Sequence, residues 1–227
     1  MSQLPRIGIT TSYKDGRQAV DVHYIHAIEQ AGGLPLIVPV LTHAEAAQQF
    51  ADLLDGLVIT GGPGITQGLI GDLPEDLEPV DPLRSKNDEW IYNALTQQPV
   101  LGICYGMQFI NAQAGGTIYA DVNAQQPDTL VHSAGRGGQN HPVHLEEQSR
   151  LRQIMNTDSL LTNTYHIQAV SAVGEGLQAV GFSPDGVIEA IESTDGRMIG
   201  VQFHPERMLE TTLPLFQDFV ARCKQNR

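Results

Sequence analysis

The most informative segment of the chain is Pro99-Val100-Leu101-Gly102-Ile103-Cys104-Tyr105-Gly106-Met107-Gln108. A short apolar strand runs into a Gly-x-Cys-x-Gly turn, and a helical pattern follows at once. This is the cysteine form of the nucleophile elbow, in which side chains at positions 102 and 106 would clash with the neighbouring strand and helix. The turn exposes a thiol at the carboxyl end of a sheet, and the adjacent helix start favours the thiolate. We therefore predict that Cys104 is a nucleophile.

The first half of the chain alternates short apolar runs with amphipathic segments. This alternation predicts βαβ crossovers, and hence an α/β fold with a mostly parallel central sheet and helices on both faces. We expect strands over residues 7–10, 34–38, 56–60 and 100–103, and helices over residues 21–31, 44–54, 85–96 and 105–114.

The second half has a different pattern, which predicts an antiparallel extension of the sheet. The turns Pro184-Asp185-Gly186 and Thr194-Asp195-Gly196 separate expected strands at 177–183, 187–193 and 198–203. An amphipathic helix is expected over residues 213–224. No linker interrupts the chain, so residues 1–227 are predicted to form one domain.

Composition excludes several classes of function. The chain has 13 Lys and Arg against 26 Asp and Glu, a net charge of −13, and no basic cluster, which argues against nucleic-acid binding. No apolar run approaches the roughly 18 residues of a membrane span. The N-terminus has the pattern of a strand rather than of a signal peptide. Its two cysteines, Cys104 and Cys223, do not form a disulfide framework, so we predict a cytoplasmic, reducing location.

The catalytic base is predicted within Gly200-Val201-Gln202-Phe203-His204-Pro205-Glu206. A strand delivers His204 at its carboxyl end, and Pro205 fixes the backbone so that His204 and Glu206 can project into the same space. A cysteine nucleophile needs a base, and the imidazole needs an acceptor on its other nitrogen to fix its tautomer. The predicted triad is Cys104, His204 and Glu206.

An oxyanion hole is predicted opposite the thiol. Attack on an amide places negative charge on the carbonyl oxygen, which backbone N–H groups should stabilise. The amide of Tyr105 at the helix start is one candidate donor. The amide of Gly62 is the other, because the glycine turn at residues 60–64 lets the backbone approach a substrate closely.

These motifs, in this order, resemble the class I glutamine amidotransferase superfamily. Further segments resemble its gamma-glutamyl-gamma-aminobutyrate hydrolase family, and the likeness covers nearly the whole chain. They are the stretch from Ala27 to Pro39, Asn111-Ala112-Gln113-Ala114-Gly115-Gly116-Thr117-Ile118-Tyr119-Ala120-Asp121, Asn163-Thr164-Tyr165-His166-Ile167-Gln168-Ala169-Val170 and Asp185-Gly186-Val187-Ile188-Glu189-Ala190-Ile191-Glu192.

The resemblance implies a class I glutamine amidotransferase-like, flavodoxin-like fold and a gamma-glutamyl hydrolase that works through a thioester without a cofactor. Its substrate would be a small gamma-glutamyl compound whose leaving group stays open: gamma-aminobutyrate, another amine, an amino acid or ammonia. Gln108 would contact the glutamyl group, and Thr164, Tyr165 and His166 would line that side of the pocket. A homo-oligomer is compatible with the sequence.

The chain departs from the family pattern at three places. Pro63-Gly64-Ile65-Thr66 stands where an Asp-Val pair is usual after Gly-Gly, and Arg84-Ser85-Lys86-Asn87-Asp88 stands where Arg-Asp-x-x-Glu is expected. Ile167 replaces a second histidine. All three positions fall in expected substrate-side segments rather than in the triad.

Two other classes of function stay open. The chain could be a glutaminase subunit that delivers ammonia to a synthase partner, or a non-enzymatic binding protein on the same fold. A metal site built from His132, His141, His144 and His166 is not expected. The reasons are that no Cys or carboxylate set accompanies these histidines, and that residues three apart on a strand face opposite sides.

Overall fold

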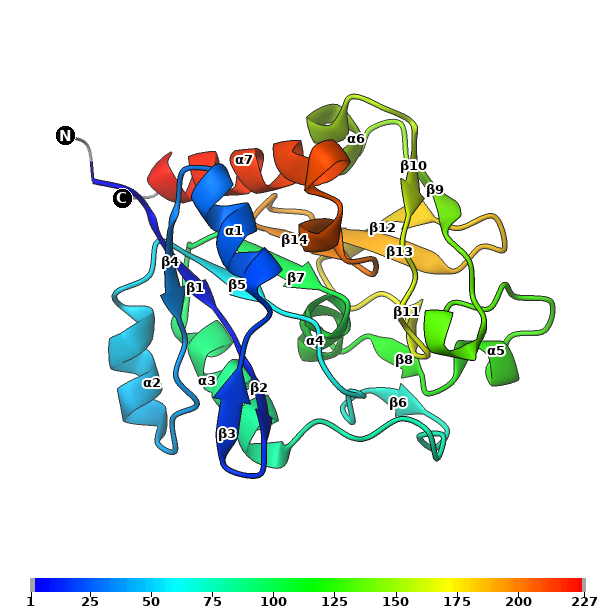
Figure 1. Cartoon of the computed structure of the whole chain (residues 1–227), viewed down its shortest axis with the longest axis horizontal. Helices are drawn as coiled ribbons and strands as arrows, with labels where there is room; N and C mark the ends of the chain where they lie inside the picture. Colours follow the sequence, from blue (N-terminus) through cyan, green and yellow to red (C-terminus); the bar gives the residue numbers. More distant parts are fainter. Residues whose placement is uncertain (1–2, 226–227) are drawn as a thin grey trace.

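A computed structural model describes residues 3–225, so the predicted domain limits, 1 and 227, lie outside the described residues. Within this range, five parallel strands form one half of a mixed sheet in the order β14-β7-β5-β1-β4 (Figure 1). This confirms the predicted parallel α/β sheet. The strands are β1 (Arg6–Ile9), β4 (Leu34–Ile37), β5 (Gly56–Ile59), β7 (Val100–Ile103) and β14 (Met198–Val201).

The antiparallel extension continues from β14 through β13, β12, β9 and β10. A smaller branch leaves β13 through β11 to β8 and β6, and β2 pairs with β3 as a separate hairpin. The bounds are β2 (Ser12–Lys14), β3 (Arg17–Ala19), β6 (Leu69–Ile70), β8 (Thr117–Tyr119), β9 (His141–Leu145), β10 (Ser159–Thr162), β11 (Ala169–Ala172), β12 (Leu177–Phe182) and β13 (Ile188–Ser193).

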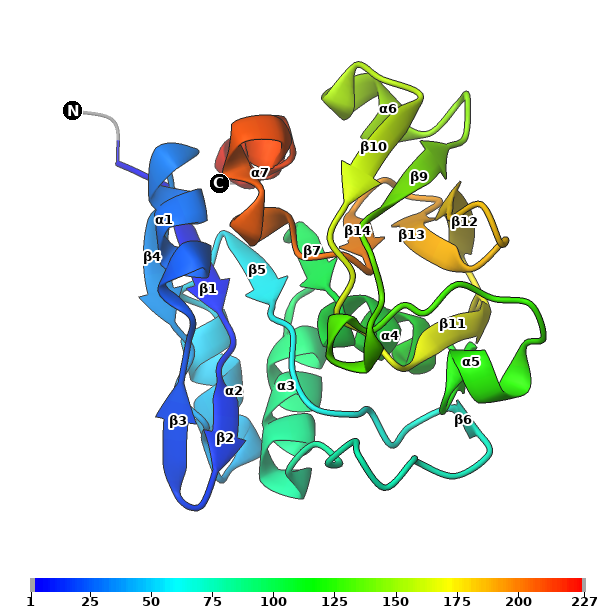
Figure 2. The same cartoon turned by 45° about the vertical axis from the view of Figure 1, so that its right-hand side comes forward.

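Helices cover both faces of the parallel half (Figure 2). One face carries α1 and α7, and the other carries α2, α3 and α4. The helices are α1 (Val22–Gln30), α2 (Ala44–Ala51), α3 (Pro82–Ala94), α4 (Tyr105–Gln113), α5 (Val122–Gln125), α6 (Arg150–Met155) and α7 (Leu209–Gln225), with 3-10 turns at η1 (Ala134–Arg136) and η2 (Pro205–Arg207).

Strand β5 shows why the sheet needs both helical layers. All its residues are buried, and their side chains alternate between two cores. Val58 packs with α1 and α7, whereas Leu57 and Ile59 pack with α2, α3 and α4. A continuous apolar run of this kind is typical of a parallel strand covered on both faces.

Two helices begin earlier than the sequence pattern predicts. Helix α3 begins at Pro82 rather than Ser85, because the Asp81 side chain accepts a hydrogen bond from the Leu83 amide and proline is tolerated in the first turn. Helix α7 begins at Leu209 rather than at residue 213, with Pro214 inside it. Within the described residues, no helix is both long and apolar enough to cross a bilayer.

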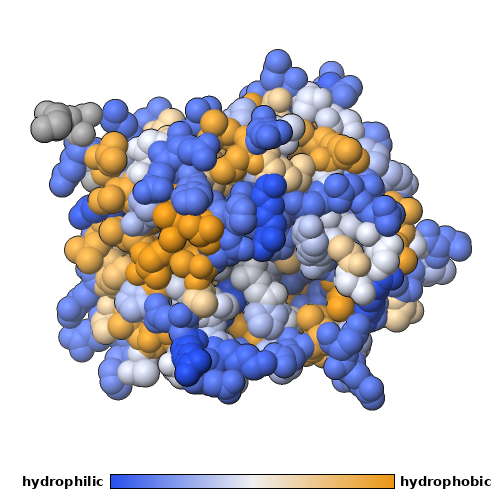
Figure 3. Space-filling view, in the orientation of Figure 1, coloured by the Kyte–Doolittle hydropathy of each residue, from blue (hydrophilic) through white to orange (hydrophobic). Residues whose placement is uncertain are grey.

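Apolar side chains gather on the surface over the edge strand β4 and the start of α1 (Figure 3). Val22, Leu34 and Ile37 are 48%, 43% and 38% exposed there. This surface lies at the β4 edge of the sheet, whereas the residues discussed next follow the carboxyl ends of β5, β7 and β14.

Candidate active site

The chain turns sharply at Cys104, between β7 and α4. Cys104 has φ 53° and ψ −106°, a conformation that costs a non-glycine residue about 1–3 kcal/mol. A Cβ atom on Gly102 would lie 2.6 Å from the carbonyl oxygen of Gly106, and one on Gly106 would lie 2.1 Å from that of Ile59. Both positions therefore require glycine, and the turn that they permit presents the thiol at the end of the sheet.

His204 follows β14 and lies beside a buried carboxylate. Its Nδ1 is 2.7 Å from Oε1 of Glu206, which is 1% exposed. Asn163 holds the backbone of His204 on both sides, because its Oδ1 accepts from the His204 amide at 2.8 Å and its Nδ2 donates to the His204 carbonyl at 2.9 Å. The role of this asparagine was missed from the sequence.

The electrostatics of the site favour the imidazolium form of His204. Burial lowers the pKa of His204, but the hydrogen bond and charge of Cys104, together with those of Glu206, outweigh burial and raise the pKa to about 10. The ring can therefore hold a proton between the thiol and the carboxylate at neutral pH. Such an arrangement suits nucleophilic attack followed by protonation of a leaving amine.

The glycine turn after β5 lies against the same histidine. The Gly61 amide donates to the Tyr24 hydroxyl at 3.0 Å, and a Cβ atom on Gly61 would lie 2.7 Å from Cε1 of His204. The Gly61 amide is thus already paired within the protein. The next amide, that of Gly62, borders a hollow that Cys104 also lines. This turn can bring a backbone donor close to the thiol, as an oxyanion hole requires.

A buried arginine packs against this glycine turn and donates hydrogen bonds to its carbonyl groups. Arg84 of α3 is 0% exposed, and its Nη2 donates to the carbonyl oxygens of Thr60 and Gly61, both at 3.2 Å. Its guanidinium lies 4.5 Å from the centre of the Tyr105 ring and 3.4 Å from a carboxylate oxygen of Asp88. Burial raises the pKa of Asp88 to about 6 even though Arg84 acts in the opposite direction. Arg84 therefore joins the two predicted oxyanion segments.

Three of the four predicted glutamyl-side residues, Gln108, Tyr165 and His166, line the hollow beside Cys104, and Thr164 does not. Tyr165 is 53% exposed, and its ring meets the His204 ring edge-on at 5.7 Å. Gln108 is buried, and its Nε2 donates to the Gln168 carbonyl at 3.0 Å and to the Gln202 side chain at 3.1 Å. The hollow is lined by Gly62, Pro63, Gly64, Leu77, Cys104, Gln108, Tyr165, His166, Ile167 and Gln168.

Two of these residues are tied into the protein rather than free in the hollow. Thr164 is 1% exposed, and its hydroxyl donates to the His132 carbonyl. His166 is 3% exposed, and its Nδ1 lies 3.0 Å from the carbonyl oxygen of Gln168. The sequence did not separate the exposed side chain of Tyr165 from the buried side chains of Thr164 and His166, and their contact with a substrate stays a prediction.

Of the histidines considered for a metal site, one is exposed and the others are buried. His144 is exposed on β9, while His141 on the same strand is buried, as the expected alternation requires. The structure brings His132 and His141 together with Glu189 of β13. Glu189 supplies the carboxylate that the sequence pattern did not place beside these histidines.

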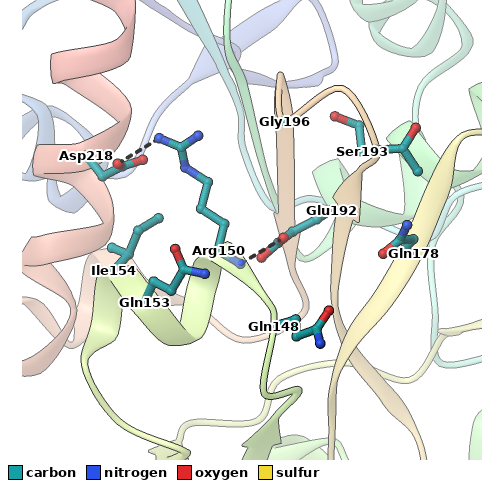
Figure 4. A pocket seen from close by; sticks show the side chains of 10 residues that line it. Gln148, Arg150, Gln153, Ile154, Gln178, Glu192, Ser193, Gly196 and Asp218 are labelled. Carbon is teal, nitrogen blue, oxygen red and sulfur yellow. Dashed lines mark hydrogen bonds and ion pairs between the residues drawn. The ribbon is translucent and has the colours of Figure 1, made fainter.

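A larger pocket of about 630 Å³ lies elsewhere, between α6, α7 and the β12–β13 hairpin (Figure 4). Its charged side chains already have partners. Arg150 pairs with Asp218 at 3.0 Å, and the Glu192 carboxylate accepts from the amides of Arg150 and Leu151 at the start of α6. Cys104 does not line this pocket, so the larger volume of the pocket is no reason to place the catalytic site there.

Comparison with known proteins gives one family and several relatives. The family model described as Peptidase C26 matches residues 4–206. A Schizosaccharomyces pombe protein provisionally named a glutamine amidotransferase is 33% identical, over 98% of this chain and 88% of its own length. Protein NtpR of Enterococcus hirae is 33% identical, over 81% of this chain and 79% of its own length.

Two further comparisons concern activity and fold. The gamma-glutamyl-gamma-aminobutyrate hydrolase PuuD of Escherichia coli is 29% identical, over 92% of this chain and 88% of its own length. A crystal structure of a Thermoplasma acidophilum protein, provisionally described as one of the subunits of GMP synthase, matches with a TM-score of 0.68 and 17% identity, covering 99% of this chain and 96% of that one. The structural match shows a common fold.

Proposed function

Because the chain belongs to the peptidase C26 family of class I glutamine amidotransferase-like proteins, we propose that it is a cysteine hydrolase that cleaves the gamma-glutamyl amide bond of a small gamma-glutamyl compound. The observation that carries this proposal is the arrangement of three side chains at one end of the sheet. Cys104 stands in the strained turn, His204 stands beside it, and Glu206 accepts at 2.7 Å from the far nitrogen of that imidazole.

The reaction begins when the Cys104 sulfur attacks the side-chain carbonyl carbon of the gamma-glutamyl group. A carbon–sulfur bond forms, and the carbonyl oxygen becomes an oxyanion held by the amides of Gly62 and Tyr105. The carbon–nitrogen bond then breaks as His204 gives its proton to the leaving amine. Glu206 keeps the imidazole oriented and stabilises its charged form.

The second half of the reaction releases glutamate. Water attacks the thioester carbon while His204 removes one of the water protons. The carbon–sulfur bond breaks, the thiolate returns to Cys104, and His204 is again an imidazolium. Atoms and charges balance without a cofactor: water supplies the oxygen of the new carboxyl group, whose remaining proton passes to solvent to leave the carboxylate.

We propose different tasks for the residues on the glutamyl side. Tyr165 is the most exposed of the four and stands against His204, so it is the candidate for direct substrate contact. Gln108, Thr164 and His166 hold hydrogen bonds to the protein backbone, and they fix the shape of the hollow. Substrate groups would then bind to the surface that these residues hold in place.

The first test is glutamate release from gamma-glutamyl-gamma-aminobutyrate, from several gamma-glutamyl peptides and from glutamine. Gamma-glutamyl-gamma-aminobutyrate heads this set because PuuD carries that substrate in its name. We expect release from at least one gamma-glutamyl amine or peptide, and none from the Cys104→Ala variant. Full activity of that variant would refute the mechanism.

A second candidate function is a glutaminase subunit that supplies ammonia to a synthase. It is favoured by the relative named as a glutamine amidotransferase and by the fold shared with a protein described as part of GMP synthase. The same assay separates the two functions. Glutamine hydrolysis that appears only when a larger partner is added, with no release from other gamma-glutamyl compounds, would favour the second candidate.

A further inference from the structure

Three imidazole rings and one carboxylate meet in the interior, next to the candidate active site. His132 comes from the loop before η1, His141 from β9, His166 from the loop before β11, and Glu189 from β13. They are 0%, 5%, 3% and 0% exposed. One oxygen, Oε1 of Glu189, lies 3.2 Å from His132 Nδ1, 3.3 Å from His141 Nε2 and 3.3 Å from His166 Nε2.

The outward nitrogen of each ring already faces an oxygen acceptor. A carbonyl or carboxylate oxygen cannot donate, so the ring nitrogen facing it carries the hydrogen. In a neutral imidazole the inward nitrogen then carries no hydrogen, and its lone pair is free to bind a cation. The outward pairs are His132 Nε2 with Asp185 Oδ2 at 2.9 Å, His141 Nδ1 with the Gln139 carbonyl at 3.3 Å and His166 Nδ1 with the Gln168 carbonyl at 3.0 Å.

Hydrogen bonds alone do not account for the inward atoms. His132 Nδ1 and His166 Nε2 lie within ion-pair distance of Oε1 but lack the geometry of a hydrogen bond to it, and Oε2 of Glu189 has no hydrogen-bond partner among the described residues. If all three histidines were protonated, all three would donate to Oε1 of Glu189. Oε2 would then have no donor, and three positive charges would lie together in the interior. Buried groups left this way are costly, so an occupant between them is expected.

A metal ion would satisfy the three inward nitrogens and Oε1 of Glu189 together. Ligands about 2.0–2.1 Å from a tetrahedral Zn²⁺ stand about 3.3 Å apart, close to the three nitrogen–oxygen distances observed here. The inward atoms of His132, His141 and Glu189 lie within 4.8 Å of one another. His166 is not part of that group, but its Nε2 lies 3.3 Å from the same Glu189 oxygen. Metal-binding histidines characteristically donate their other N–H to a carbonyl or carboxylate, as all three do.

We propose that this cluster binds one divalent transition-metal ion, with Zn²⁺ the best fit, through His132, His141, His166 and Glu189. Imidazole and carboxylate ligands suit such an ion. Four protein ligands close the coordination sphere, which is the pattern of a structural rather than a catalytic zinc site. The ion joins four segments that are distant in sequence.

The position of the cluster indicates a structural role for the ion. His166 lines the hollow beside Cys104, and the Gln168 carbonyl that pairs with His166 also accepts from Gln108. An ion held by His166 therefore fixes the loop at residues 163–168 on the glutamyl side of the hollow. This proposal is independent of which substrate is cleaved, because the ion is not placed at the reacting atoms.

The test measures metal content and metal-dependent stability in the full chain carrying Cys104→Ala, so that an ion on the catalytic thiol is not counted. In this background Glu189→Gln removes the carboxylate at nearly constant size. His144→Ala removes an exposed histidine of the same strand as His141 and is the matched control. We expect about one ion per chain by elemental analysis in the parent and in His144→Ala, and much less in Glu189→Gln.

After removal of metal with a chelator, added Zn²⁺ should raise Tm by several degrees in the parent and in the control, but not in Glu189→Gln. If Glu189→Gln does not fold, Co²⁺ replaces Zn²⁺ in the parent, and the visible spectrum should be that of tetrahedral Co²⁺ without sulfur ligation. A parent that purifies without metal and gains no stability from Zn²⁺ would overturn the proposal. A sulfur-to-cobalt charge-transfer band would do the same, since it would place the ion on Cys223.

Discussion

A Cβ atom built on Gly62 would lie 2.3 Å from Nη1 of Arg84, a side chain that is itself completely buried. The guanidinium fills the space directly beneath the glycine turn and donates to the carbonyls of Thr60 and Gly61. Because the arginine holds these two carbonyls, a completely buried side chain fixes the position of the following amide, that of Gly62. The geometry of the proposed oxyanion hole therefore depends on a contact between a loop and a helix.

Replacing Gly62 with alanine should lower kcat by about a hundredfold, comparable to the loss of one oxyanion donor. The added methyl group must displace either the turn or the guanidinium beneath it, and the Gly62 amide moves with the turn. Glutamate release from the best substrate measures the effect. Gly135→Ala is the matched control, because its Cβ would meet no atom closer than 3.7 Å. Equal activity in the two variants would contradict the assignment of the Gly62 amide.

The Arg84–Asp88 pair makes a second prediction, which separates stability from catalysis. Removing Arg84 alone, as Arg84→Met, leaves the fully buried Asp88 carboxylate without its guanidinium and should cost about 3–5 kcal/mol of unfolding free energy. Replacing both residues, as Arg84→Met with Asp88→Leu, should recover most of that loss. Urea denaturation at neutral pH measures both values.

Activity should not recover with stability in the double variant. The carbonyls of Thr60 and Gly61 still lack their donor there, so we expect kcat to stay low in a folded protein. A double variant with the kcat of the natural chain would show that Arg84 stabilises the fold but does not position the turn.

The sequence predicted the parallel half of the fold and the sharp turn at Cys104, for identifiable physical reasons. Continuous apolar runs bounded by glycine mark strands covered on both faces, and β5 and β7 lie as predicted, with β5 one residue shorter. The glycines at 102 and 106 are required by contacts of 2.6 and 2.1 Å, and such requirements appear in the sequence as a fixed spacing. Local constraints of this kind need no knowledge of distant residues.

The features that were missed depend on residues brought together from far apart. Asn163 clamps a histidine 41 positions away, and Arg84 reaches a carbonyl 24 positions away. Strands β9 and β10, which pair with each other while β9 also pairs with β12, mix polar and apolar residues, so no continuous apolar run marks them in the sequence. Glu189 is fully buried on β13, a place where only the three histidines opposite explain a carboxylate.

Asn163 gives a third prediction, about positioning of the base. Asn163→Ala removes both hydrogen bonds to the His204 backbone, so the imidazole loses its fixed distance from the thiol, and we expect kcat to fall by about tenfold or more. Asn163→Asp keeps the acceptor for the His204 amide but sets a carboxylate oxygen against the His204 carbonyl, and it should be at least as impaired. Asn140→Ala, at an exposed position, is the control. An Asn163→Ala variant with unchanged kcat would remove this residue from the site.

The raised pKa of His204 makes the last prediction, for the dependence of activity on pH. Protonation of the leaving amine needs the imidazolium, and a pKa of about 10 keeps His204 charged through neutral pH. Activity limited by this step should therefore persist to mildly alkaline pH and decline as pH rises toward about 10. Glu206 is one of the groups that raise this pKa, so Glu206→Gln should shift the alkaline decline to lower pH and leave a measurable residue of activity. Profiles of kcat/KM against pH for both proteins measure the shift. Identical alkaline limbs would mean that Glu206 does not act on the imidazole, whatever the loss in rate.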